Sequence, residues 1–190
     1  MKRFFDVVIS LFGLIILSPL LLLTAVVIFI DDGLPVVFRQ ERVGKDSKHF
    51  TIYKFRTMKK DTRSAATGEL HESEEQITKS GRILRKTSVD ELLQLVNVLN
   101  GTMSIVGPRP LIPEEEEIHA LREQYGVYKV RPGVTGWAQV NGRDALDDET
   151  KALYDKEYVE KQSIVFDIKI LIKTVMVVLK RENITEGGEQ

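Results

Sequence analysis

The chain has 190 residues, with 27 Lys and Arg against 28 Asp and Glu, so its formal net charge is −1. This length allows one domain with a sizeable core, and a hydrophobic content of 43% argues against wholesale disorder. The near-neutral charge argues against a nucleic-acid partner. Cysteine is absent, which excludes a disulfide framework, a thiolate zinc site and a cysteine nucleophile.

The N-terminal segment differs from the rest because residues 7–30 carry no charged side chain. A helix of these 24 residues is about 36 Å long, which is enough to cross a bilayer. Three interpretations compete: a cleaved signal peptide, a spanning anchor, and a helix that enters and leaves by one face. The signal peptide is disfavoured because the apolar run is long and no small-residue cleavage site follows it.

Ser18-Pro19 lies in the middle of the run and favours the re-entrant interpretation. Proline removes a backbone N–H and clashes with the carbonyl of Ile15, so it kinks or breaks a helix. The Ser18 hydroxyl can hydrogen-bond the backbone that the proline frees, which lipid cannot do. Basic residues flank the run on both sides, so the positive-inside rule places both flanks in the cytoplasm. Because spanning helices also tolerate proline, the spanning anchor stays open at this point.

The remaining segments alternate between strand-like, helical and irregular patterns. Residues 34–57 predict a β-hairpin with its turn at residues 44–46, and residues 39–63 hold nine basic and three acidic side chains. We expect a loop with little core over 61–76, a helix over 83–99 that stops at Asn100-Gly101, and an irregular loop at 107–110. The expectations for the C-terminal half are a helix from Pro113, a structured loop over 130–143, an acidic surface helix over 145–161, and over 164–179 either a core helix or an amphipathic interfacial helix.

The stretch Arg85-Lys86-Thr87-Ser88-Val89-Asp90-Glu91 carries the candidate chemistry. Ser88 and Glu91 have the spacing of a capping box, which puts Asp90 and Glu91 in the first turn of the helix. In one interpretation these acids only cap the helix. In the other, the helix N-terminus holds phosphate and keeps Asp90 ionised, so that it can attack phosphorus, with Arg85 neutralising phosphate oxygens.

Two adjacent carboxylates also suit Mg²⁺, which prefers hard oxygen ligands and pairs with phosphate substrates. Other common sites are disfavoured, because the sequence holds no P-loop, no Gly-x-Ser-x-Gly motif and no histidines at metal-ligand spacing.

Taken in order, these motifs resemble the bacterial sugar transferases, the small monotopic phosphoglycosyl transferases, over nearly the whole chain. The matching segments are the basic-apolar start with Ser18-Pro19, Lys54-Phe55-Arg56-Thr57-Met58, residues 84–92, 97–101, 103–111 and 131–143, and Tyr154-Asp155-Lys156-Glu157-Tyr158.

The resemblance implies an α+β, mainly helical fold. It comprises a re-entrant N-terminal helix hairpin broken at Ser18-Pro19 (residues 1–33), and a cytoplasmic catalytic domain at the membrane surface (residues 34–190) with interfacial amphipathic helices and a small β-hairpin. The implied location is the bacterial inner membrane, monotopic, with the site on the cytoplasmic face. The oligomeric state stays open, and a homo-oligomer is allowed.

The resemblance also implies a reaction. A UDP-sugar donates sugar-1-phosphate to polyprenyl (undecaprenyl) phosphate, UMP is released, and a covalent aspartyl-phosphosugar forms on the way as the first membrane step of glycoconjugate assembly. The residues carried over are Asp90 as nucleophile, Glu91 as its partner, Mg²⁺ held by both, and a substrate-binding set comprising Arg85, Pro108, Arg109, Pro110, Arg143 and Lys54.

A second hypothesis from another class is a membrane-anchored binding module without turnover. It would dock a partner or anionic lipid through the basic residues 39–63. Release of UMP from a UDP-sugar distinguishes the two hypotheses.

Overall fold

The computed structural model describes residues 1–60, 76–142 and 145–180 and shows the predicted mainly helical fold with few strands. Most of the loop expected over 61–76, and Arg143, lie outside the described residues. The helices are α1 (Lys2–Asp32), α2 (Lys79–Thr87), α3 (Gln94–Asn100), α4 (Glu116–Gln124), α5 (Asp148–Lys161) and α6 (Ile164–Lys180). The strands are β1 (Val37–Val43), β2 (His49–Phe55), β3 (Ser104–Val106) and β4 (Gly133–Thr135), and the 3-10 helices are η1 (Lys45–Ser47), η4 (Val89–Leu93), η5 (Val127–Lys129) and η6 (Gln139–Asn141).

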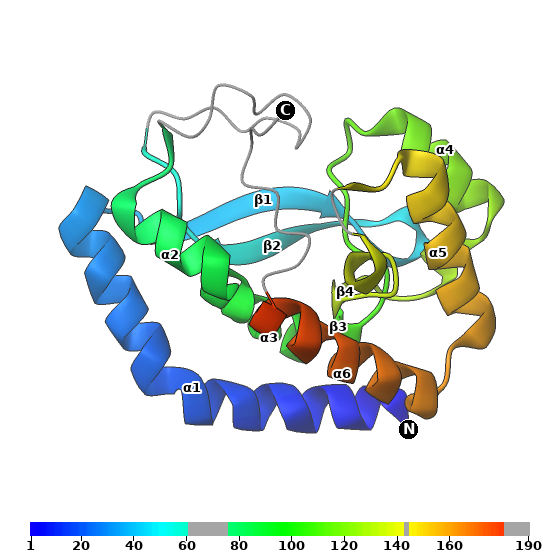
Figure 1. Ribbon diagram of the computed structural model, residues 1–190, viewed down its shortest axis with the longest axis horizontal. Coiled ribbons are helices and arrows are strands. Elements are labelled where there is room, and N and C mark those ends of the chain that lie inside the picture. The colour runs from blue at the N-terminus through cyan, green and yellow to red at the C-terminus, as the bar shows by residue number, and fades with distance from the viewer. Residues whose placement is uncertain (61–75, 143–144, 181–190) are drawn as a thin grey trace.

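The apolar N-terminal segment forms one helix, α1, which continues through Pro19 and bends in its middle (Figure 1). The Ser18 hydroxyl donates to the Ile15 carbonyl at 2.7 Å. This is the acceptor that Pro19, which has no N–H, cannot satisfy. The structure therefore has a bend where the sequence predicts a break. By length and composition α1 is able to cross a membrane, and its large apolar side chains are mostly exposed, among them Phe4, Ile16 and Ile30.

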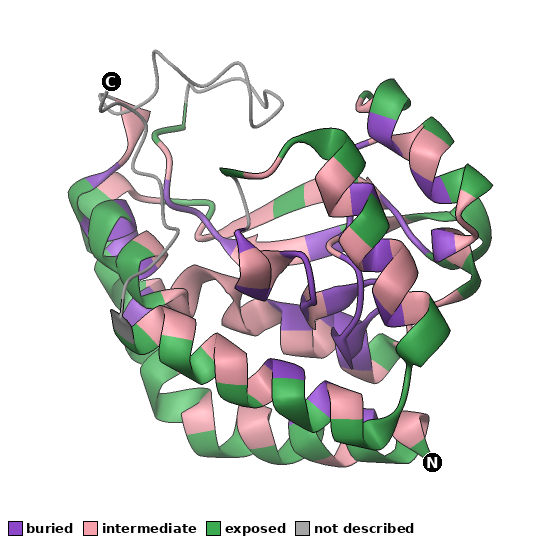
Figure 2. Ribbon diagram, turned by 45° about the vertical axis from the view of Figure 1, so that its right-hand side comes forward, coloured by how far each residue is buried: buried purple, intermediate pink, exposed green. Residues whose placement is uncertain are grey.

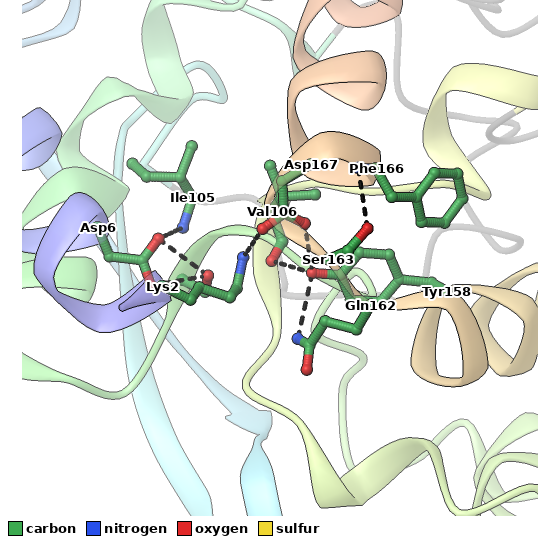
Figure 3. Close-up of polar contacts among 10 residues, drawn as sticks. Lys2, Asp6, Ile105, Val106, Tyr158, Gln162, Ser163, Phe166 and Asp167 are labelled. Atoms are coloured by element: carbon green, nitrogen blue, oxygen red, sulfur yellow. Dashed lines mark hydrogen bonds and ion pairs between the residues drawn. The ribbon is translucent and has the colours of Figure 1, made fainter.

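The first end of α1 is tied to the protein by polar contacts (Figure 3). Lys2 Nζ lies 2.6 Å from Asp167 Oδ2 of α6. The buried Asp6 carboxylate accepts from the Ile105 N–H at 3.0 Å and from the Ser104 hydroxyl at 2.9 Å. Because a buried carboxylate is costly unless hydrogen-bonded, these contacts fix α1 against β3.

The second end of α1 is tied to the same body. Asp31 accepts from the Ser80 N–H of α2 at 2.8 Å, and Asp32 pairs with the buried Arg56 guanidinium at 2.8 Å. Hydrogen bonds from Ser80 hold the pKa of the Asp31 carboxyl below its usual range. Both ends of α1 are thus anchored by polar contacts to the same folded unit.

β1 and β2 form the predicted antiparallel hairpin, in which Gln40 pairs with Ile52 and Arg42 pairs with Phe50. Side chains alternate across a strand, so Gln40, Arg42 and Lys54 project from the same face. η4 and α3 lie against β2. Of these three side chains, Lys54 reaches Glu91 of η4.

The prediction of a single continuous helix over residues 83–99 is wrong. α2 ends at Thr87, and Ser88 adopts a left-handed conformation (φ 54°, ψ 20°) before η4 and α3. The predicted stop is confirmed, since α3 ends at Asn100 and is followed by Gly101 with φ 84°. The left-handed Ser88 turns the chain, so that residues 89–93 form a separate short segment against the hairpin.

β3 and β4 pair in parallel at the centre of the molecule. A Cβ on Gly133 would lie 2.1 Å from the Gly107 nitrogen, so only glycine allows this approach. The main core gathers around this pair. Its fully buried members include Tyr158, whose hydroxyl lies 2.9 Å from both the Val106 carbonyl and Asp167 Oδ1.

The two C-terminal helices each have one buried face. α5 was expected as a surface helix, yet it buries Ala152, Asp155 and Tyr158. Ile170 of α6 lies in the core, as the core-helix alternative predicts, whereas much of the helix's apolar surface is exposed. Figures 1 and 2 show α6 running beside the N-terminal half of α1, before its bend. Exposed positions lie along the outer sides of both helices. The exposed large apolar residues of α6 are Ile164, Val165, Ile168, Ile172, Val175, Met176 and Leu179.

Candidate active site

Asp90 and Glu91 lie in the first turn of η4, against the face of β2. The predicted capping box is wrong: the Ser88 side chain makes no cap hydrogen bond, and the Glu91 carboxylate is engaged by Lys54 instead. The left-handed conformation of Ser88 explains this, because a capping residue is normally extended. The Glu91 carboxylate therefore faces the hairpin rather than the Ser88 backbone.

Glu91 is held by two cations. Lys54 Nζ lies 2.8 Å from Glu91 Oε1, and the two side chains are only 16% and 14% exposed. Arg109 Nη1 lies 3.5 Å from the same oxygen. Burial lowers the pKa of Lys54, while the neighbouring Glu91 carboxylate opposes that change. The predicted residues Lys54, Glu91 and Arg109 thus meet, although they are far apart in the sequence.

The carboxyl of Asp90 has a pKa raised from 3.8 to about 6, first by burial and then by the negative charge of Glu91. The charges of Lys54 and Arg85 act in the opposite direction. The pKa of Asp90 is thus raised by burial rather than lowered by a helix N-terminus. At neutral pH most of Asp90 is still ionised, and it is poorly solvated, which suits a nucleophile.

Arg85 reaches the site from the last turn of α2. Its Nε donates to the hydroxyl of the buried Thr57 at 3.0 Å, just beyond the end of β2. Its positive charge acts to lower the pKa of Asp90. The third predicted arginine, Arg143, lies outside the described residues.

The loop after β3 carries Pro108, Arg109 and Pro110. Both prolines are buried, while Arg109 is half-buried with its guanidinium toward Glu91. Of the three residues predicted to bind substrate here, Arg109 therefore supplies the charge, and the prolines shape the backbone that presents it.

Arg42 is a charged neighbour of this site that the sequence reasoning missed. Its Nη1 donates to the Pro110 carbonyl at 3.3 Å, and its Nη2 donates to Gln40 Oε1 at 2.5 Å. Burial and the nearby Arg109 charge lower the pKa of Arg42 to about 10. The available signal was the alternation of the predicted strand, which puts Arg42 and Lys54 on one face.

The donor set at Asp90 and Glu91 fits a magnesium ion only in part. Mg²⁺ sites commonly use one or two carboxylates together with substrate phosphates, and each carboxylate here lies in the field of the other. Within residues 1–60, 76–142 and 145–180 no group of three His, Asp or Glu side chains forms a metal cage. The two acids thus fit an ion that phosphate helps to hold, and do not form a complete site alone.

The site combines adjacent carboxylates with lysine and arginine side chains, in a chain that also carries a long apolar helix. Residues 1–181 match the family described as bacterial sugar transferase, so the chain belongs to this family of transferases.

Similar proteins agree with this assignment. The chain is 44% identical over 186 residues to the "Uncharacterized sugar transferase EpsL" of Bacillus subtilis (strain 168), covering 98% of this chain and 91% of that protein. It is 41% identical over 182 residues to the UDP-glucose:undecaprenyl-phosphate glucose-1-phosphate transferase of Escherichia coli (strain K12), covering 92% of this chain and 39% of the relative. It is 39% identical over 197 residues to the undecaprenyl-phosphate galactose phosphotransferase of Salmonella typhimurium, covering 96% and 41%. The chain thus spans about two fifths of the latter two relatives.

Proposed function

We propose that the protein transfers sugar-1-phosphate from a UDP-sugar to polyprenyl phosphate and releases UMP. The observation that carries the proposal is a largely buried pair of carboxylates, Asp90 and Glu91, on which the charges of Lys54, Arg85 and Arg109 act. Such a cluster suits a diphosphate, whose charge the cations balance. Relatives named as undecaprenyl-phosphate sugar transferases support the same substrate classes.

The proposed mechanism has two displacements at one phosphorus atom. A carboxylate oxygen of Asp90 attacks the phosphorus that bears the sugar, and the bond from that phosphorus to the bridging oxygen breaks. The bridging oxygen leaves with its electron pair as part of UMP. A phosphate oxygen of the polyprenyl phosphate then attacks the same phosphorus and releases the Asp90 carboxylate, so that the enzyme is restored.

Each charged residue has a defined part in this proposal. Arg85 and Arg109 bind phosphate oxygens, with Arg143 as a further candidate from the sequence. Lys54 forms an ion pair with Glu91. Its charge also opposes the effect of burial on the pKa of Asp90, which favours the ionised carboxylate. Mg²⁺ held by Asp90, Glu91 and substrate phosphate would neutralise charge on the phosphoryl group. Covalent catalysis lets one pocket serve a soluble substrate and a lipid substrate in turn.

We also propose that α1 enters the cytoplasmic leaflet of the bacterial inner membrane and leaves by the same face. Support comes from its two ends, which are both anchored to the domain of residues 34–190 through Asp6 and Asp32. Support also comes from the exposed apolar sides of α1 and α6, which run side by side. In this arrangement α6 is an interfacial helix, and the site is held beside the lipid headgroups.

The enzymatic proposal is tested by UMP release from a panel of UDP-sugars with Mg²⁺ and polyprenyl phosphate. One donor should support turnover, and Asp90→Asn should abolish it. A donor labelled at the sugar-bearing phosphorus should leave label on the wild-type protein but not on the variant. Asp148→Asn is the matched control, since Asp148 is an exposed acid of α5 paired with Lys151, and it should be fully active.

Two outcomes would contradict the proposal. UMP release by Asp90→Asn at the wild-type rate excludes Asp90 as nucleophile. No release from any donor favours the binding module.

The topology is tested with single cysteines, which is direct because the chain has none. One cysteine is inserted after Met1 and, in a separate protein, Lys45 is replaced by cysteine. A membrane-impermeant maleimide should label both from the cytoplasmic side only. Labelling from opposite sides would show that α1 spans the membrane.

A further inference from the structure

We propose that Arg42 and Arg122 form an arginine clamp that positions Arg109 for the reaction. The inference rests on the proposed function for the role of Arg109, and on contacts to the loop at residues 108–111 for the clamp itself. Neither residue stood out in the sequence.

The loop needs side-chain donors because of its composition. Pro108 and Pro110 have no N–H, so this segment cannot form an ordinary ladder of backbone hydrogen bonds on both sides. Its four consecutive carbonyls nevertheless all accept a hydrogen bond. The donors are the Gly133 N–H to Pro108 at 2.8 Å, Arg122 Nη1 to Arg109 at 2.8 Å, Arg42 Nη1 to Pro110 at 3.3 Å, and the Val43 N–H to Leu111 at 2.9 Å.

Arg122 is the fixed half of the clamp. It lies on α4 and is 3% exposed, and its Nη2 donates to Asp155 Oδ2 of α5 at 2.5 Å. Asp155 is itself buried, and burial raises the pKa of its carboxyl although Arg122 opposes this. Loss of either partner would leave an uncompensated buried charge, which strongly destabilises the folded protein. The guanidinium is therefore held in one place, where its other nitrogen meets the Arg109 carbonyl.

Arg42 is the second half and comes from the hairpin. Gln40, on the same face of β1, accepts from its Nη2 and so directs its Nη1 toward the Pro110 carbonyl. Arg42 also supports the loop from an element different from the one that carries Arg122. Two guanidinium groups on β1 and α4 thus hold the consecutive carbonyls of Arg109 and Pro110, one on each side of the Pro110 ring.

The consequence concerns the Arg109 side chain, which branches immediately before the first of these two carbonyls. With its carbonyl and the next one fixed, Arg109 starts from a defined backbone position, and its guanidinium reaches to within 3.5 Å of Glu91. Catalytic groups must be held within a fraction of an ångström by such supporting contacts. Arg42 and Arg122 are positioning residues, because they act on the reaction through Arg109.

A double-mutant cycle on kcat/KM for UMP release tests the inference. In the wild-type background, Arg42→Met and Arg122→Lys should each lower kcat/KM by about 10- to 100-fold. In an Arg109→Met background the same changes should cost less than about threefold, since the residue through which they act is gone. Equal losses in both backgrounds would refute the positioning role.

Two further variants separate charge and general structure from positioning. Arg42→Lys retains the charge but loses the fork that joins Gln40 to Pro110, so it should remain impaired; full activity would overturn the inference. Arg131→Met is the matched control, since Arg131 Nε also donates to a carbonyl, that of Gly101, outside this loop. It should leave kcat/KM unchanged in both backgrounds.

Amide hydrogen exchange supplies a measurement that does not depend on turnover. Peptides that cover residues 107–112 should exchange faster in Arg42→Met than in wild type or in Arg131→Met, with thermal unfolding confirming that the variants are folded. Unchanged exchange would overturn the clamp even if the enzyme is active. If wild type releases no UMP but exchange rises as expected, the proposed function fails and the clamp stands as a structural device.

Discussion

Replacing Asp90, the proposed nucleophile, by Asn should make the protein more stable while it abolishes activity. Burial and the Glu91 charge raise the pKa of Asp90 from 3.8 to about 6. A shift of about 2 pKa units corresponds to about 3 kcal/mol. Because the folded-state pKa is the higher one, the protonated carboxyl favours folding, and this advantage is lost as the pH rises through about 6. The ionised Asp90 carboxylate therefore destabilises the folded protein at pH 8. The neutral Asn amide has a similar shape and removes this destabilisation.

The assay is denaturant unfolding in detergent with EDTA, at pH 4 and at pH 8. Asp90→Asn should exceed wild type in free energy of unfolding by about 3 kcal/mol at pH 8 and by less than about 1 kcal/mol at pH 4. Glu91→Gln is the matched control with the opposite expected sign, because it removes the partner of the largely buried Lys54, at a cost on the order of 3 kcal/mol. An Asp90→Asn protein no more stable than wild type at pH 8 would refute this account of the site.

Three further changes test the site and its support. The kcat/KM for UMP release should fall about tenfold per pH unit below about pH 6, as Asp90 gains a proton; a flat profile down to pH 5 would contradict this. Gly133→Ala should lower the free energy of unfolding by about 1–3 kcal/mol, since its Cβ meets the Gly107 nitrogen. Tyr158→Phe should cost about 1–3 kcal/mol by leaving the buried Val106 carbonyl without its donor. An unchanged Tm in either variant would show that the strand pair adapts.

Local patterns in the sequence were sufficient for the elements that depend on near neighbours. The hairpin follows from two β-prone runs around a turn, and its alternation puts Lys54 on the correct face. The bend in α1 follows from Pro19, and the Ser18 hydroxyl takes the role expected for it. The stop at Gly101 follows from the ease with which glycine adopts positive φ.

The helix over 83–99 failed because periodicity reports which residues are apolar, not where the backbone turns. Ser88 adopts a left-handed conformation that residues other than glycine, asparagine and aspartate rarely take, and no local signal marks it. The segment gains by turning, because η4 then lies against β2 and Glu91 reaches Lys54. A long-range ion pair thus replaced the local capping box that the same residues predicted.

The resemblance supplied the identity of the site residues, but the electrostatics of the site required the fold. Asp90 was expected to be ionised by a helix dipole, which is a local effect. Its pKa is instead set by burial against Glu91, and is opposed by Lys54 and Arg85 from two other elements. The same holds for Arg109, whose position depends on Arg42 and Arg122. The site contains several buried charges, and each of them needs a partner. The residues that support the chemistry are therefore found by identifying the partner of each buried charge.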